Sequence, residues 1–148
     1  MSRAIVDCAR GWIGTPYVHQ AAKRGAGCDC LGLVRGVWAE VSETALMKVA
    51  AYTPDWSEPQ GVEALWDGAA KYLMRKDIKD AAHGDVVLFR MRQGSVAKHV
   101  GIQADIGPSP TFIHAYQGHG VLENALSRPW QRRLVARFAF PEHAQNKV

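Results

Sequence analysis

The spacing of apolar residues changes once along this chain of 148 residues, and that change most constrains its fold. Up to Leu73, apolar residues recur at intervals of three and four, which is typical of amphipathic helices. From Val86 onward they stand in short runs separated by turn residues, which is typical of strands. Helices followed by closely connected strands predict an α+β fold, in which N-terminal helices pack on a central antiparallel sheet of about five or six strands.

The expected elements form one domain over residues 1–140, followed by a short polar tail over 141–148. We expect helices over residues 2–12, 30–41 and 61–73, a weakly helical stretch over 42–51, and strands over 86–89, 99–103, 111–116, 121–123 and 134–140. Residues 52–56 are expected to form a turn-rich loop, and residues 92–95 a hairpin-like turn.

Charge and hydropathy argue against several classes of function. The net charge of +4 is mild and scattered, so we expect no nucleic-acid specificity. Because no apolar run approaches the roughly 20 residues that span a bilayer, we expect no membrane insertion. Asp7 and Arg10 interrupt the start of the chain too early for a signal peptide. We therefore expect synthesis in the cytoplasm, with any task outside the cell depending on another export route.

The three cysteines do not form a familiar metal or disulfide pattern. Cys28 and Cys30 are too close for the usual zinc spacing, and no second pair follows them. An odd number of cysteines also argues against a disulfide framework. We expect neither a metal site nor a cofactor.

Cys30 is expected in the first turn of the helix over 30–41. Gly25 and Gly27 break the preceding chain, and Asp29 is a good N-cap residue. The unpaired N–H groups and the positive dipole end at a helix start favour a thiolate over a thiol. Cys30 is therefore a candidate nucleophile, and a buried structural thiol is the alternative.

A cysteine nucleophile needs a base, and the base needs a third polar group that orients its ring. His99 and His114 each lie in an apolar strand, whereas His83, His119 and His143 are expected in turns or the tail. A histidine in an apolar strand is more often a buried core residue with hydrogen-bonded ring nitrogens than a catalytic residue. The sequence alone does not show whether these two histidines meet Cys30. His19 is expected to be a surface-loop residue, and the alternative is that it lines the cleft next to Tyr17.

Five segments carry a resemblance to a known family. They are residues 14–17 (GTPY), 28–34 (CDCLGLV), 83–89 (HGDVVLF), 99–102 (HVGI) and 112–115 (FIHA). In this order they resemble the NlpC family of papain-like cell-wall cysteine peptidases. Residues 52–56 and 90–92 are similar to the phage-tail branch of that family, which includes peptidases of tailed phages and gene transfer agents.

The resemblance implies a papain-like NlpC-type fold and a set of catalytic roles. Family members cleave peptidoglycan peptide stems, typically between γ-D-glutamate and a diamino acid, through a cysteine thioester. By this resemblance Cys30 is the nucleophile, His99 is the base, and His114 orients His99.

Three further residues are implicated in binding. The backbone N–H of Cys30 and the Tyr17 hydroxyl would stabilise the oxyanion, and Asp29 would contact the free amine of the stem, which is compatible with its N-cap role. Leu31 stands where the family usually has serine, and the replaced hydroxyl would lie near the substrate, so the resemblance fixes the type of reaction more firmly than the way the stem binds.

The implied partners are a peptidoglycan stem and the tail-tip or hub proteins of a phage-like particle, from which the enzyme would act on the cell wall. Two alternatives remain open at this level. One is a structural tail or hub protein that keeps the fold with little activity. The other is a related amidase or acyltransferase that uses the same thioester chemistry.

Overall fold

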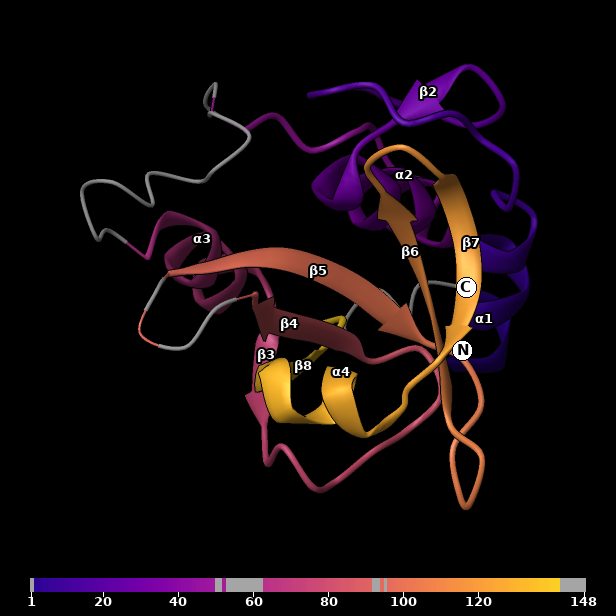
Figure 1. Cartoon of the computed structure of the whole chain (residues 1–148). Coiled ribbons are helices and arrows are strands. Elements are labelled where there is room, and N and C mark those ends of the chain that lie inside the picture. The colour runs from indigo at the N-terminus through magenta and orange to yellow at the C-terminus, as the bar shows by residue number, and fades with distance from the viewer. Residues whose placement is uncertain (1, 50–51, 53–62, 92–93, 95, 142–148) are drawn as a thin grey trace.

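The computed structural model describes residues 2–49, 52, 63–91, 94 and 96–141. The elements in chain order are α1 (Ser2–Arg10), β1 (Ala22–Lys23), β2 (Gly27–Cys28), α2 (Cys30–Ser42), α3 (Ala64–Tyr72), β3 (Met74–Lys76), β4 (Val86–Arg90), β5 (Ala97–Gln103), β6 (Thr111–Tyr116), β7 (Gly120–Ala125), α4 (Arg128–Arg133) and β8 (Leu134–Ala139) (Figure 1).

The main sheet has six strands in the order β3-β8-β4-β5-β6-β7, and all neighbours are antiparallel. The predicted α+β class and the antiparallel sheet of five or six strands are confirmed. Helices α1 and α2 pack against one face of this sheet (Figure 1). The amphipathic pattern of the first half therefore supplies the helical layer that covers the sheet of the second half.

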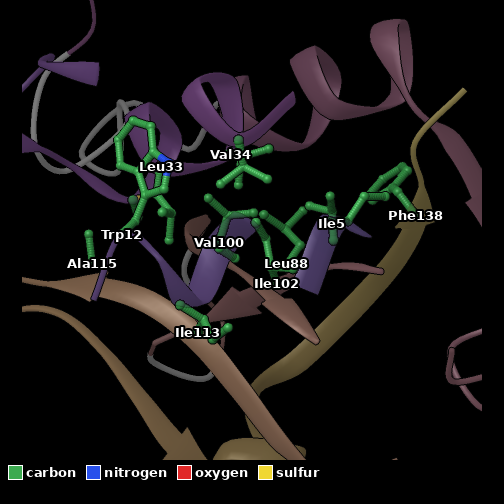
Figure 2. Close-up of a cluster of buried hydrophobic side chains, with 14 of the residues drawn as sticks. Ile5, Trp12, Leu33, Val34, Leu88, Val100, Ile102, Ile113, Ala115 and Phe138 are labelled. Atoms are coloured by element: carbon green, nitrogen blue, oxygen red, sulfur yellow. The ribbon is translucent and has the colours of Figure 1, made fainter. Parts of the chain in front are cut away.

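The larger hydrophobic core lies between the helices and this face. Figure 2 shows Trp12, which follows the end of α1, and Leu33 of α2 on the helix side of this core, with Val100 and Ile113 on the sheet side. All four side chains are buried. Burial of a large apolar side chain contributes about 2 kcal/mol, so this interface holds α2 against β5 and β6.

A smaller core lies on the opposite face of the sheet. It consists of Val87, Phe89, Phe112 and Leu126, with Met91, Trp130 and Leu134 packed against it. Because successive side chains of a strand point to opposite faces, the run 86–89 supplies both cores, and for this reason it is apolar throughout. Trp130 belongs to α4, which covers this second face.

Strands β5 and β6 diverge over most of their length. Their pairing is confined to Ile102 with Ile113 and Gln103 with Phe112. Beyond these pairs the two strands separate, whereas β6 and β7 remain paired from end to end (Figure 1). The N-terminal half of β5 and the C-terminal half of β6 therefore flank an opening in the sheet.

Several sequence-based boundaries differ from the structure. The weakly helical stretch over 42–51 is wrong within residues 43–49, because α2 ends at Ser42 and Glu43 adopts a left-handed φ of 56°. The Ser42 hydroxyl turns back to the Trp38 carbonyl at 2.6 Å, which caps the last turn. The third helix begins at Ala64, later than expected. Short helix α4 and strands β1, β2 and β3 were not predicted.

Some expected features fall outside the described residues. Only Tyr52 of the loop over 52–56, Gly94 of the turn over 92–95 and Pro141 of the tail are described. The boundaries of the domain at 1–140 stay a prediction.

Candidate active site

Asp29 fixes the start of α2 and thereby the place of Cys30. Its backbone is extended, with φ −99°, and its Oδ1 accepts a hydrogen bond from the Gly32 N–H at 2.7 Å, so the predicted N-cap is confirmed. A Cβ at position 32 would lie 1.8 Å from the Ala21 carbonyl oxygen. Only glycine therefore lets the preceding loop pack against this first turn.

The second carboxylate oxygen of Asp29 is also occupied. Oδ2 accepts the Gln20 N–H at 2.7 Å and a short hydrogen bond from the Tyr52 hydroxyl. The ring of His19 lies beside it, with Nδ1 3.7 Å from Oδ2. The buried carboxylate thus ties the loop, the helix start and Tyr52 together.

This anchoring makes Asp29 important for stability. We expect Asp29→Ala to lower the free energy of unfolding by about 2 kcal/mol, because it removes the cap and leaves the Gln20 N–H without its acceptor. Urea unfolding followed by circular dichroism measures the change. Asp80→Ala, at an exposed carboxylate, is the matched control and should change stability by less than about 0.5 kcal/mol. Equal stability of both variants would contradict the anchoring role.

Cys30 is the first residue of α2 and lies at the opening between β5 and β6. Its thiol is buried, and the residue is 5% exposed. The backbone groups of Cys30, of Leu31 and of Val100 on β5 act on the thiol, and each lowers its pKa against the larger effect of burial. The contact with Val100 places the thiol against the strand that carries His99, although α2 and the His99 side chain belong to opposite faces of the sheet.

His99 and His114 form a hydrogen-bonded pair. His99 Nε2 lies 2.7 Å from His114 Nδ1, and the two rings are nearly perpendicular at 77°. His114 Nε2 lies 2.6 Å from Oδ1 of Asn124 on β7. A chain of side chains therefore runs from the cavity through both histidines to Asn124.

Aromatic rings surround the histidine pair. Phe89, Phe112 and Trp130 lie with ring centroids between 4.2 and 6.0 Å from one or both imidazoles. His114 is fully buried at 0% exposure and His99 is 7% exposed. The smaller core thus holds both imidazoles in an apolar layer, which fixes their positions and removes water from them.

Gly101 provides the space that His114 needs. A Cβ at position 101 would lie 3.0 Å from the Ile113 carbonyl oxygen, 3.0 Å from a Phe112 ring carbon and 3.2 Å from His114 Cβ. We expect Gly101→Ala to destabilise the fold by about 1–3 kcal/mol and to displace His114 from His99. Thermal unfolding measures the loss. Gly68→Ala is the matched control, since its Cβ would meet nothing within 4 Å on α3 and should be neutral or stabilising. A Gly101→Ala variant as stable as wild type would refute this account of packing.

The site opens into a cavity of about 160 Å³. It is lined by Tyr17, His19, Asp29, Cys30, Tyr52, Met91, Lys98, His99, Ala115, Tyr116 and Gln117. The structure therefore brings Tyr17, Asp29, Cys30 and His99 to one cavity, with His114 behind His99.

The structure places Leu31 differently from expectation and His19 in agreement with both of its expected positions. Leu31 does not line the cavity around Cys30; it lines a larger, apolar cavity of about 410 Å³ bounded by α2 and α3. His19 is exposed, as expected for a loop residue, but it also lines the cavity, where its Nε2 lies 3.0 Å from the Tyr52 carbonyl oxygen. The expected surface-loop position is confirmed, and the alternative that His19 lines the cleft holds as well, because the hydrogen bond from the Gln20 N–H to Asp29 Oδ2 keeps this loop at the cavity.

Sequence reasoning missed Tyr52, Asn124 and Trp130 as parts of the site. Tyr52 was seen only within a turn-rich loop, and α4 with Trp130 was not predicted. The register of β6 and β7, which pairs Phe112 with Asn124, sets Asn124 beside His114. The sequence offered no signal for Asn124, because it follows the charged Glu123 at the partly exposed end of β7.

The ionisation of the site differs from the sequence-based expectation of a thiolate. Burial, reinforced by Asp29, raises the pKa of Cys30 to about 12 and outweighs the backbone N–H groups that oppose it. Burial lowers the pKa of His99 to about 3, with a smaller effect from His114, and lowers the pKa of His114 to about 4 against the opposing hydrogen bond of Asn124. The cavity therefore holds a neutral thiol, with a neutral imidazole pair at its wall.

Such a pair suits nucleophilic attack assisted by a general base. A thiol that gives its proton to an imidazole as the sulfur bonds to a carbonyl carbon needs no preformed thiolate. Within the described ranges, no three His, Cys, Asp or Glu side chains are grouped so as to hold a metal ion. None of the helices in those ranges has the length and apolar character that a bilayer crossing requires.

Solved structures provide a comparison for this arrangement. The NlpC/p60 domain of the peptidoglycan hydrolase SagA is 24% identical with a TM-score of 0.64, and the match covers 95% of this chain and 99% of that one. An NLP/P60 family protein similar to lipoprotein from Staphylococcus aureus subsp. aureus Mu50 is 22% identical with a TM-score of 0.61, covering 94% of this chain and 41% of the other. An NlpC/P60 family protein from Bacillus cereus ATCC 10987 is 16% identical with a TM-score of 0.63, covering 95% and 40%.

These likenesses support the papain-like NlpC-type fold. The chain spans about two fifths of the Staphylococcus aureus and Bacillus cereus proteins and nearly all of the SagA domain. No curated protein is significantly similar to it in sequence. The sequence model of the NlpC/P60 family matches residues 14–138, which include every residue of the cavity and both histidines. The chain therefore belongs to the NlpC/P60 family.

Proposed function

We propose that this protein is a peptidoglycan hydrolase that cleaves peptide stems through a cysteine thioester, at the bond between γ-D-glutamate and a diamino acid. The observation that supports it best is the meeting of Cys30 and His99 in one cavity, with His114 hydrogen-bonded behind His99. Membership of the NlpC/P60 family and the likeness to the SagA hydrolase domain favour the same substrate class.

In the proposed mechanism, Cys30 Sγ attacks the carbonyl carbon of the scissile amide while its proton moves to His99. His99 then donates this proton to the leaving amine, and the acyl group remains on sulfur as a thioester. Water attacks the thioester with His99 as base, which releases the new carboxylate and restores the thiol. His114 holds the His99 ring through the 2.7 Å hydrogen bond during both transfers.

The oxyanion is stabilised at the start of α2. In this proposal the N–H of Cys30, the first residue of α2, donates to the oxyanion, and the half-buried Tyr17, which lines the same cavity, supplies a second donor. Burial raises the pKa of the Tyr17 phenol above its ordinary value, so it remains a hydrogen-bond donor at neutral pH. Each such donor contributes about 3 kcal/mol to transition-state stabilisation.

Asp29 and Leu31 act in stem binding under this proposal. The free amine of the stem approaches Asp29 Oδ2, shares it with the Gln20 N–H and takes the place of the Tyr52 hydroxyl. Leu31 acts from the neighbouring apolar cavity, which shares Tyr52 with the cavity around Cys30.

The biological setting is a tail component of a phage or phage-like gene transfer particle, bound to tail-tip or hub proteins and opening the cell wall from outside the cytoplasm. The likeness of residues 52–56 and 90–92 to the phage-tail branch supports this setting. The proposed reaction does not depend on this setting, because it uses only residues of the cavity and His114.

Digestion of defined muropeptides, with products identified by mass spectrometry, tests the chemistry. The expected products are a fragment ending in a γ-D-glutamate carboxylate and a fragment with a free diamino-acid amine. Release of the intact stem from the sugar would instead assign an amidase. Absence of any cleavage by the wild-type protein, together with its incorporation into particles, would favour the structural tail role and overturn the enzymatic proposal.

A further inference from the structure

We infer that Asn124 is a positioning residue that sets which ring nitrogens of His114 and His99 carry protons, so that His99 presents a bare Nδ1 to Cys30. The inference deepens the proposed function, since it concerns how the same cavity is made competent. It is carried by the hydrogen-bonded chain from His99 through His114 to Asn124 Oδ1.

The proton positions follow from the acceptor at the end of the chain. Asn124 turns its amide oxygen, not its NH2 group, toward His114, and because an amide oxygen accepts hydrogen bonds and cannot donate them, His114 Nε2 carries the proton at the 2.6 Å contact in this orientation of the amide. A neutral imidazole carries one proton, and His114 Nδ1 is therefore a bare acceptor. The proton in the 2.7 Å contact then belongs to His99 Nε2. In neutral His99 this leaves Nδ1 bare.

The bare nitrogen is the one that the chemistry needs. His99 lines the cavity with Cys30, and its Nε2 is committed to His114, so Nδ1 is the nitrogen left for the thiol proton. In the reverse arrangement, His114 would donate from Nδ1 and His99 would carry its proton on Nδ1. A ring in that state has no lone pair for the thiol proton and does not serve as the base.

Burial makes the choice between these arrangements decisive. Both imidazoles are almost completely buried, and burial holds both in the neutral form, in which only one nitrogen is protonated. His114 is 0% exposed, so water does not replace either hydrogen-bond partner of its ring nitrogens. Asn124, at the end of this series of hydrogen bonds, therefore selects the tautomer.

Strand pairing holds Asn124 in place. β6 and β7 are paired over their full length, with Phe112 opposite Asn124 and His114 opposite Leu122. Asn124 and His114 are thus diagonal neighbours on one face of a continuous ladder. The selecting group stands on the most regular part of the sheet rather than on a loop.

Nitrogen-15 NMR of the full chain, labelled at histidine, tests the inference at pH 7. Long-range correlations identify the protonated nitrogen of each ring, and His99→Gln and His114→Gln assign the signals. Wild type should show protonated Nε2 and bare Nδ1 on both residues. A spectrum with His114 protonated at Nδ1 and bare at Nε2 would overturn the inference.

Two variants separate tautomer selection from simple packing. Asn124→Asp keeps an oxygen acceptor and should keep both tautomers. Asn124→Leu removes the acceptor and should give mixed tautomers, with kcat reduced at least about tenfold and KM unchanged, since a wrong tautomer in a serine-protease triad costs about 10⁴ in kcat. Unchanged tautomers in Asn124→Leu would refute the role. If that variant fails to fold, the wild-type and Asn124→Asp spectra decide.

The same measurements distinguish failure of the inference from failure of the proposed function. Correct tautomers in a protein that cleaves no muropeptide would leave the inference standing and refute the hydrolase. Muropeptide cleavage by a protein with reversed tautomers would refute the inference and leave the hydrolase standing.

Discussion

Cys30→Ser is expected to lower kcat/KM for muropeptide cleavage by at least about 10³-fold, because complete loss of the nucleophile of a serine-protease triad costs about 10⁶ in kcat and serine replaces only part of that loss. Serine retains the size and polarity of the side chain, but its hydroxyl is a much weaker nucleophile than sulfur beside an imidazole base. Chromatographic release of stem fragments measures the change. Circular dichroism and thermal unfolding should match wild type, since position 30 keeps its backbone contacts with Leu31 and Val100.

Cys8→Ser is the matched control for this experiment. Cys8 lies half-buried on α1, its sulfur is 3.2 Å from Glu40 Oε2, and it does not line the cavity. Its replacement should leave kcat/KM within about twofold of wild type. If Cys30→Ser keeps a tenth of the activity, or if Cys8→Ser loses as much, the assignment of Cys30 as nucleophile fails.

Acidification below pH 6.5 is expected to destabilise the fold strongly. Burial lowers the pKa of His99 to about 3 and of His114 to about 4, from the ordinary 6.5 that applies to the unfolded chain. Between those values the unfolded chain binds protons that the folded chain does not, so stability falls as the pH falls. Below pH 6.5 each group approaches a slope of about 1.4 kcal/mol per pH unit, and because the unfolded histidines are only half protonated at pH 6.5, the two together give about 3 kcal/mol between pH 6.5 and 5.0.

Urea unfolding at pH 7.5 and pH 5.0 measures this dependence. His99→Gln removes one of the two groups and should reduce the slope by about half. His119→Gln, at an exposed histidine, should leave the wild-type slope unchanged. An identical pH dependence in wild type and His99→Gln would show that buried neutral histidines are not its source.

The elements that follow local rules were predictable from the sequence. The N-cap at Asp29, the start of α2 at Cys30 and the buried strands over 86–89 and 111–116 all depend on neighbouring residues. The end of α2 at Ser42 was not predictable from the sequence. The local pattern would allow the helix to continue, but Glu43 adopts a left-handed conformation that ends it. Helix α4 depends on covering the second face of the sheet, which no local pattern reports.

The sequence singled out Tyr17, Asp29, Cys30 and His99, which line one cavity, but it predicted neither their convergence nor the electrostatic environment of that cavity. The resemblance named Cys30, His99 and His114, and the cavity brings the thiol and the first histidine together. The expectation of a thiolate considered only the helix start, whereas tertiary burial dominates the ionisation. Asn124 and Tyr52 reach the site through strand register and loop packing, and neither is encoded in sequence spacing.

The opening between β5 and β6 has a consequence for how this protein loses activity. Cys30 belongs to the larger core between α1, α2 and the sheet, while His99 packs against Phe89 and Trp130 of the smaller core, and the two residues line one cavity. Damage to the smaller core would misalign the imidazoles and leave the larger one folded. Inactive yet well-folded variants should therefore accumulate around α4, at positions that never touch a substrate.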